Sequence, residues 1–280
     1  MRDMNLKNNC KRAAGLGLIA AGALMASQAA MACQTSAWST PDGGPGSVTA
    51  GDPTGGISRY SGFCGMQTAD GQVSYVADES PGGIDRIRAR FYVKLDNDVD
   101  DAVFFQARDA GGGIFLLEAD TNGEITLQGA SSPITAPGRP GFWNSVEVDW
   151  DPNGGGATLT VGFGDNTPTG GDTLVPAGPQ NASISQAAPI ESVRLGNLDG
   201  VTGTFSFDAY ESRRTEAIGP LVRGDGDGNG IIGGGDISTI LTEFTGAGLA
   251  SGQVDCDENG VVGGGDISCV LNLFLGNYDF

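Results

Sequence analysis

A twelve-residue segment near the carboxy end of the chain occurs twice, and this repeat constrains the fold more than any other feature. Residues 225–236 read DGDGNGIIGGGD, and residues 255–266 read DCDENGVVGGGD. Both copies place side-chain oxygens at positions 1, 3, 5 and 12 and glycine at position 6. Alternate positions of a tight loop converge on one point, so each copy is predicted to be a loop that surrounds a cation.

The spacing is that of the EF-hand calcium loop, which offers hard oxygen ligands from positions 1, 3, 5, 7 and 12. Glycine at position 6 allows the sharp turn, and the residue at position 7 supplies its backbone carbonyl. Position 12 is Asp in both copies where the usual loop has Glu, so the following helix must approach the ion more closely. The sequence therefore predicts two Ca²⁺ ions, held by Asp225, Asp227, Asn229, Ile231 and Asp236 and by Asp255, Asp257, Asn259, Val261 and Asp266.

An apolar pattern with helical period follows each loop. Its members are Ile237, Ile240, Leu241 and Phe244, which recur as Ile267, Val270, Leu271 and Phe274. Two loop–helix units without an entering helix resemble the type I dockerin module, over about residues 221–276. The resemblance implies a cohesin-type scaffold protein as partner and a role in polysaccharide-degrading assemblies. The chain departs from the family at loop positions 10 and 11, where glycines 234–235 and 264–265 replace the partner-selecting side chains.

The amino end has the features of an export signal. Four basic residues precede an apolar run over residues 13–26, and Ala30-Met31-Ala32 matches the small-x-small cleavage pattern. The run is shorter than the roughly 20 residues that span a bilayer. We therefore expect a signal peptide over residues 1–32 and a secreted protein, with the periplasm or cell surface as alternative locations. Acylation of Cys33, as in a lipoprotein, is the alternative processing.

Composition narrows the functions that remain. The chain carries 15 basic and 34 acidic residues, a net charge of −19, and so acidic a surface repels nucleic acid and anionic lipid. No nucleic-acid partner is therefore expected, and because no second hydrophobic segment appears, no membrane span is expected either. Histidine is absent, which excludes Ser-His-Asp and Cys-His catalysis and histidine-bound zinc. Carboxylate chemistry, which glycosidases use, stays open.

Four cysteines remain after the predicted cleavage, namely Cys33, Cys64, Cys256 and Cys269. An even number of cysteines in an exported chain favours disulfides, although the sequence alone does not fix the pairing. Proximity along the chain favours Cys33–Cys64 and Cys256–Cys269. The second pair would join a calcium loop to its own helix.

The middle of the chain is predicted to be an antiparallel β-sandwich, because short strand patterns alternate with turns and no helical period appears. The expected strands cover residues 86–95, 102–106, 114–118, 124–128, 145–150, 157–162, 192–195 and 204–209. A Trp143-x-x-Val146-x-Val148-x-Trp150 strand and Phe205-x-Phe207-Asp208 resemble the laminin-G and concanavalin A-like jelly rolls. The expected domains are residues 1–32 (signal peptide), 33–56 (irregular leader), 57–219 (sandwich) and 220–280 (dockerin-like module).

Three features of the sandwich have two readings each. Glu147, Asp149 and Asp151 resemble the Glu-x-Asp-x-Glu catalytic strand of laminarinase-type glycosidases, or they form an outward polar face. The acidic turn at residues 96–101 is either a third calcium site or a solvated turn. Aromatic residues could stack on sugar rings or fill the core: Tyr60, Phe63, Tyr75, Trp143 and Tyr210.

Three functional hypotheses follow. The first is a secreted, non-catalytic calcium-binding protein whose lectin-like sandwich and dockerin-like module associate with polysaccharide. The second is a jelly-roll O-glycosyl hydrolase that uses Glu147 with Asp149 or Asp151. The third is a structural component of an extracellular matrix, ordered by calcium. No catalytic residue is assigned, and whether the chain is an enzyme stays open.

Overall fold

The computed structural model describes residues 34–51, 55–62, 64–80, 82–97, 99, 101–153, 156–163, 173–184, 189–216 and 218–276. The predicted signal peptide lies outside these ranges. Within them, no helix has the length and hydropathy needed to cross a lipid bilayer.

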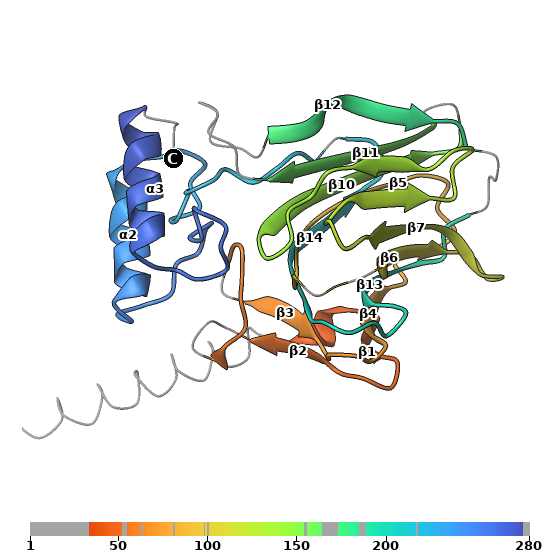
Figure 1. The fold of residues 1–280 in the computed structure, drawn as a ribbon, viewed down its shortest axis with the longest axis horizontal. Helices are drawn as coiled ribbons and strands as arrows, with labels where there is room; N and C mark the ends of the chain where they lie inside the picture. Colours follow the sequence, from red (N-terminus) through yellow and green to blue (C-terminus); the bar gives the residue numbers. More distant parts are fainter. Residues whose placement is uncertain are drawn as a thin grey trace, which may run out of the picture.

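The strands in the described ranges form two antiparallel sheets that pack as a β-sandwich, which confirms the predicted fold class (Figure 1). One sheet has the order β1 (Thr40–Gly43), β4 (Ser74–Asp78), β13 (Ser192–Asn197), β6 (Ala102–Arg108), β7 (Gly113–Ala119), β8 (Ile125–Gln128) and β9 (Ile134–Ala136). The second has the order β12 (Thr173–Ala182), β11 (Gly156–Phe163), β10 (Trp143–Asp151), β5 (Ile87–Leu95), β14 (Phe205–Arg213), β3 (Gly65–Thr68) and β2 (Val48–Gly51).

Strand β10 shows how the sequence produces the sandwich. Val146, Val148 and Trp150 alternate with polar residues and are fully buried in the core between the sheets. Side chains of a strand point alternately to its two faces, so Glu147 and Asp149 lie on the outer face of the second sheet. This alternation pins the register of β10 against β5, because a slip of one residue would expose the apolar set.

The structure corrects the expected irregular leader over residues 33–56. Strands β1 and β2 lie within it, after a short 3-10 helix η1 (Thr35–Ala37), and they pair with β4 and β3 at the edges of the two sheets. Both strands are four residues long and contain Gly or Pro, so they lack the alternating apolar pattern by which strands are recognised. An edge strand tolerates this composition because it needs backbone pairing on one side only.

The C-terminal module contains the two predicted helices, α2 (Gly234–Phe244) and α3 (Gly264–Leu275). In Figure 1 they stand side by side at one end of the molecule, and loop segments of the module lie between them and the sandwich. The module has a small core of its own, made by Ile240, Ala250, Val254, Cys256, Cys269, Val270 and Leu273.

The module covers part of the outer face of the second sheet. Tyr92 of β5 and Trp143 of β10 point to that face, yet both are fully buried, together with Tyr60. The rings of Tyr60 and Tyr92 stack with centroids 3.7 Å apart, and Trp143 meets Tyr60 edge-on at 6.0 Å. We call Tyr60, Tyr92 and Trp143 the aromatic platform. Its three rings are buried because the module covers them.

Candidate metal centre

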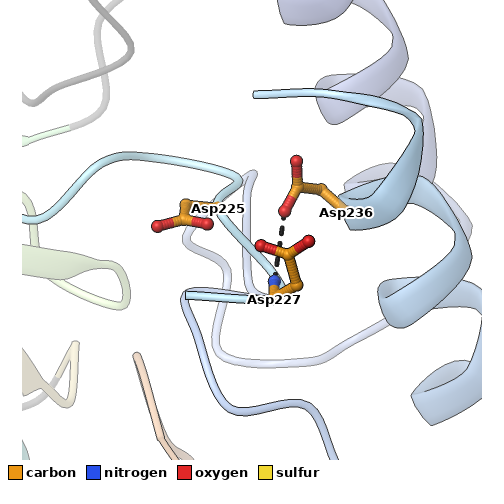
Figure 2. Close-up of side chains that lie close together, drawn as sticks. All are labelled: Asp225, Asp227 and Asp236. Atoms are coloured by element: carbon orange, nitrogen blue, oxygen red, sulfur yellow. Dashed lines mark hydrogen bonds between the residues drawn. The ribbon is translucent and has the colours of Figure 1, made fainter. Parts of the chain in front are cut away.

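The first loop brings its three aspartates together. Carboxylate oxygens of Asp225, Asp227 and Asp236 lie within 4.8 Å of one another, and Asp236 is fully buried. Figure 2 shows Asp236 extending from the start of α2 toward Asp227, with a hydrogen bond from the backbone N–H of Asp227 to Asp236 Oδ1 at 3.1 Å. Three residues separated by up to eleven positions in sequence thus surround one point.

The second loop repeats this arrangement with Asp255, Asp257 and Asp266, whose ligand atoms also lie within 4.8 Å of one another. Asp255 and Asp266 are both fully buried. Asp266 Oδ1 accepts the N–H of Asp257 at 3.1 Å, as Asp236 does in the first loop. The repeated sequence therefore folds into two equivalent acidic clusters within the described residues.

The aspartate at position 12 also caps the start of the helix, as its third residue. Asp236 Oδ2 accepts the N–H of Gly233 at 2.7 Å, and Asp266 Oδ2 accepts that of Gly263 at 2.6 Å. These bonds satisfy N–H groups that a helix start leaves unpaired, and the negative charge is favourable at the positive end of the helix dipole. The same side chain thus caps the helix with one oxygen and belongs to the acidic cluster.

One buried oxygen of the second cluster has no partner. Asp255 Oδ2 accepts the N–H of Gly260 at 2.6 Å, whereas Asp255 Oδ1 is buried without a hydrogen bond. A buried carboxylate oxygen that is left unpaired is costly, and buried charges in proteins are normally paired or bound to metal. The cluster offers oxygen donors alone, which suit a hard cation. The residues present therefore fit a bound divalent ion.

Burial and mutual repulsion shift the protonation of these carboxylates. Burial, and then the charge of Asp266, raise the pKa of Asp255 well above its ordinary value. Burial also raises the pKa of Asp266 to about 6 and raises that of Asp225. A bound cation would relieve both the desolvation and the repulsion, so protons and a divalent ion compete for these oxygens.

The remaining predicted ligands are in the loops, and their role as ligands stays a prediction. Asn229 Oδ1 accepts the N–H of Ile231, and Asn259 Oδ1 accepts that of Val261, each at 2.8 Å. These bonds hold the turn at positions 5–7. The glycine at position 11 has a steric reason, because a Cβ on Gly235 would lie 2.7 Å from Asp227 Oδ2.

The predicted link between the second loop and its helix is confirmed by a disulfide between Cys256 and Cys269. Cys64 is also disulfide-bonded, and its predicted partner Cys33 lies outside the described residues. A cross-link over a loop of this length adds about 3 kcal/mol in the chain-entropy description.

The acidic strand that resembled a glycosidase motif is engaged in structural contacts. Asp149 accepts hydrogen bonds from Arg86 and Arg88, and Asp151 forms an ion pair with Arg86 at 3.1 Å. Glu147 accepts the backbone N–H groups of residues 218 and 219, at 3.1 and 2.9 Å, and so holds the segment that leads into the module. These carboxylates stabilise the outer face of the sheet.

The acidic turn and the aromatic residues have mainly structural contacts as well. Asp96 Oδ2 accepts the N–H and hydroxyl of Thr204, at 2.9 and 2.7 Å, and residues 98 and 100 of the turn lie outside the described part of the chain. Tyr60 and Trp143 are buried beneath the module, so a sugar cannot stack on them. Phe63 lies outside the described residues, and Arg194 stacks on Tyr75 with its guanidinium carbon 4.5 Å from the ring centroid.

Sequence reasoning missed how the second loop contacts the sandwich. The hydroxyl of Tyr60 donates to Glu258 Oε1, and the backbone N–H of Trp143 donates to the carbonyl of Glu258, both at 3.1 Å. Lys94 Nζ donates to the carbonyl of Asn259, also at 3.1 Å. The signal available in the sequence was Glu258 itself, because the first loop has Gly228 at that position.

No family model matches the sequence, and no curated protein matches it. Solved structures resemble it at low identity. The protein named cellulose induced protein, Cip1, matches 64% of this chain and 92% of its own, at 14% identity and a TM-score of 0.47. The catalytic domain of a GH131 beta-glucanase from Podospora anserina matches 62% of this chain and 81% of its own, at 11% identity and a TM-score of 0.40. A sialidase matches 66% of this chain and 18% of its own, at 14% identity and a TM-score of 0.36. Likenesses of this size leave the function to be argued from the residues of the chain itself.

Proposed function

We propose that the chain is an exported calcium-binding protein in which two ions order a C-terminal module that is joined to a β-sandwich. The observation that carries the proposal is the buried, unpartnered Asp255 Oδ1 beside Asp257 and Asp266. The first loop has the same sequence pattern and the same acidic cluster, so the proposal extends to it.

Of the divalent cations, calcium is the one that the two loops fit best. Ca²⁺ accepts six to eight oxygen ligands in flexible geometry, whereas Mg²⁺ requires a nearly ideal octahedron and keeps several water molecules. Each loop provides three carboxylates, an Asn side chain and a backbone carbonyl within twelve residues. Such a dense set of protein oxygens favours the larger ion. Extracellular sites of this class bind at roughly 10⁻⁴–10⁻³ M.

Export is the setting that suits this chemistry. The disulfide between Cys256 and Cys269 is compatible with an oxidising, extracellular location. Calcium is available there at the concentrations that weak sites need. The signal peptide over residues 1–32 belongs to the same proposal and rests on its sequence pattern.

The test is a calorimetric titration of the metal-stripped chain with calcium. We expect two bound ions for the native sequence and one for each of the variants Asp227→Asn and Asp257→Asn, because each variant removes one carboxylate from one cluster. The exposed Glu124 lies outside both loops, so Glu124→Gln is the matched charge control and should bind two ions. Absence of heat at millimolar calcium would overturn the proposal.

A partner-binding role is the second proposal, and it rests on the exposed apolar side chains of the two helices. Four large apolar side chains at equivalent positions of the two repeats are exposed by 43–52%: Leu241, Phe244, Leu271 and Phe274. Apolar side chains gathered on a monomer surface are typical of interaction sites. With the dockerin resemblance, this face suggests a cohesin-type domain as partner. A polysaccharide partner for the sandwich belongs to the same proposal and rests on the resemblance alone.

The partner proposal predicts calcium-dependent binding to a type I cohesin domain, measured by surface plasmon resonance. Leu241→Asp with Leu271→Asp should weaken binding at least tenfold, because both copies of the apolar position then carry a charge. Glu124→Gln should bind as the native chain does. The departure at positions 10 and 11 makes the test informative, since glycine offers no side chain for recognition. Sedimentation of the native chain as a dimer, without cohesin binding, would assign the face to self-association instead.

A further inference from the structure

The two calcium loops differ at two places that matter for tertiary contacts. Apart from exchanges of Ile for Val, the second loop replaces Gly226 by Cys256 and Gly228 by Glu258. Cys256 forms the disulfide with Cys269 of α3. Glu258 is buried at the contact with the sandwich. Both changes therefore fasten the second loop to a neighbouring element.

Glu258 has an unfavourable backbone conformation that its contacts must compensate. Its φ angle is +60°, in the left-handed region, and the equivalent Gly228 has a φ of +74°. Glycine adopts this region without strain, whereas a residue with a Cβ does so rarely. A strained residue persists where the surrounding structure holds it, which points to a role for the Glu258 side chain.

The contacts between the second loop and the sandwich come from three consecutive loop positions. Glu258 accepts from Tyr60 and from the N–H of Trp143, while the carbonyl of Asn259 accepts from Lys94. The carbonyl of Gly260 accepts from Ser58 Oγ at 3.1 Å. In the described residues, the equivalent segment of the first loop, 228–230, makes no hydrogen bond to the sandwich.

These contacts lie on the same stretch of chain that would surround the ion. Asp257 and Asn259 are predicted ligands and flank Glu258 directly, and Asp255 Oδ2 accepts the N–H of Gly260. An ion that draws Asp255, Asp257 and Asn259 together also fixes the shape of positions 4–6. Without the ion, repulsion between the carboxylates acts on this segment, and the surface that meets the aromatic platform loses its support.

We propose that the second calcium site controls docking of loop positions 258–260 onto the aromatic platform, and that the first site does not. The inference rests on the proposed calcium function and adds a regulatory role to one of its two sites. Coupling between two sites is reciprocal, so docking and calcium affinity at the second loop should change by the same factor. Couplings of this kind typically amount to roughly 5- to 150-fold.

The experiment follows hydrogen exchange of the Trp143 amide, which donates to Glu258, in the full-length chain. With calcium this amide should be protected, and with a chelator it should exchange at least tenfold faster. Asp257→Asn should exchange fast even with calcium, whereas Asp227→Asn should stay protected. The amide of Val148 in the core of β10 should stay protected throughout and so reports that the sandwich remains folded.

A second pair of variants separates docking from ion binding. Glu258→Gly makes the loop resemble the first one, so by calorimetry it should still bind two ions, the second of them more weakly, while the Trp143 amide exchanges fast. Glu258→Gln keeps an acceptor for the Tyr60 hydroxyl and should retain protection. Two bound ions with a Trp143 amide that is insensitive to calcium and to Glu258→Gly would overturn this inference alone. No bound ion would overturn the proposed function as well.

Discussion

Removal of calcium is expected to unfold the C-terminal module while the sandwich stays folded. The module has only a small core, including Ile240, Val254, Val270 and Leu273, and a core of this size rarely stabilises a domain alone. Two like charges about 4 Å apart repel by roughly 4 kcal/mol at an effective dielectric constant near 20. Each ion, at a hundredfold excess over its dissociation constant, adds about 2.7 kcal/mol.

The measurement is differential scanning calorimetry with calcium and with EDTA, together with the helical circular dichroism signal. We expect EDTA to create an early transition that removes the signal of α2 and α3, and the main transition of the sandwich to remain. Asp227→Asn with Asp257→Asn should show the early transition even with calcium, whereas Glu124→Gln should behave as the native chain. A melting curve that EDTA leaves unchanged would contradict this expectation.

The size of this calcium effect should depend on pH in a defined direction. The folded-state pKa of Asp266 is raised by burial to about 6, above its ordinary value of 3.8. Its contribution to the stability of the metal-free protein is therefore fully present below about pH 4 and is lost as the pH rises through 6. The stabilisation by calcium should thus be largest at neutral pH and should shrink as the pH falls through 6.

The loops could be predicted from sequence because their chemistry is local. Asp225 to Asp236 lie on twelve consecutive residues, so spacing alone shows that their oxygens converge. The contact with the sandwich could not be predicted in the same way. Glu258 and Trp143 are more than a hundred residues apart, and only the fold brings them together. The amphipathic pattern of the helices likewise did not show that Leu241 and Phe244 stay exposed.

The success of strand prediction also depended on how much of the signal is local. Those with a regular alternation, such as β5 and β10, were predicted within a few residues of their ends. The short strands β1, β2, β3 and β9 were missed, because three or four residues carry no detectable period, and the longer β4 and β12 were missed as well. Their position is decided by pairing with a neighbour already in place, which is information that the local sequence does not contain.

A second large effect is expected from the ion pair between Arg59 and Glu243, which joins the sandwich to the end of α2. The side chain of Arg59 is fully buried and that of Glu243 is 6% exposed. Arg59 also donates to the carbonyl of Ala250 at 3.1 Å, and Glu243 accepts the N–H of Ala250 at 2.8 Å. Removal of one partner leaves a buried charge without its counterion, so Arg59→Met should reduce the free energy of unfolding by about 3–5 kcal/mol.

The double variant Arg59→Met with Glu243→Leu distinguishes a buried pair from a solvated one. When both charges are replaced by apolar groups, no uncompensated charge remains, so the double variant should be more stable than either single variant. Urea unfolding of the calcium-loaded chain measures all three, and the double-mutant cycle isolates the coupling of the two side chains. A loss below about 1 kcal/mol for Arg59→Met would mean that the pair behaves as a surface ion pair. Docking would then depend mainly on the contacts of Glu258, Asn259 and Gly260 with the sandwich, and the second calcium loop would hold the module in place without help from α2.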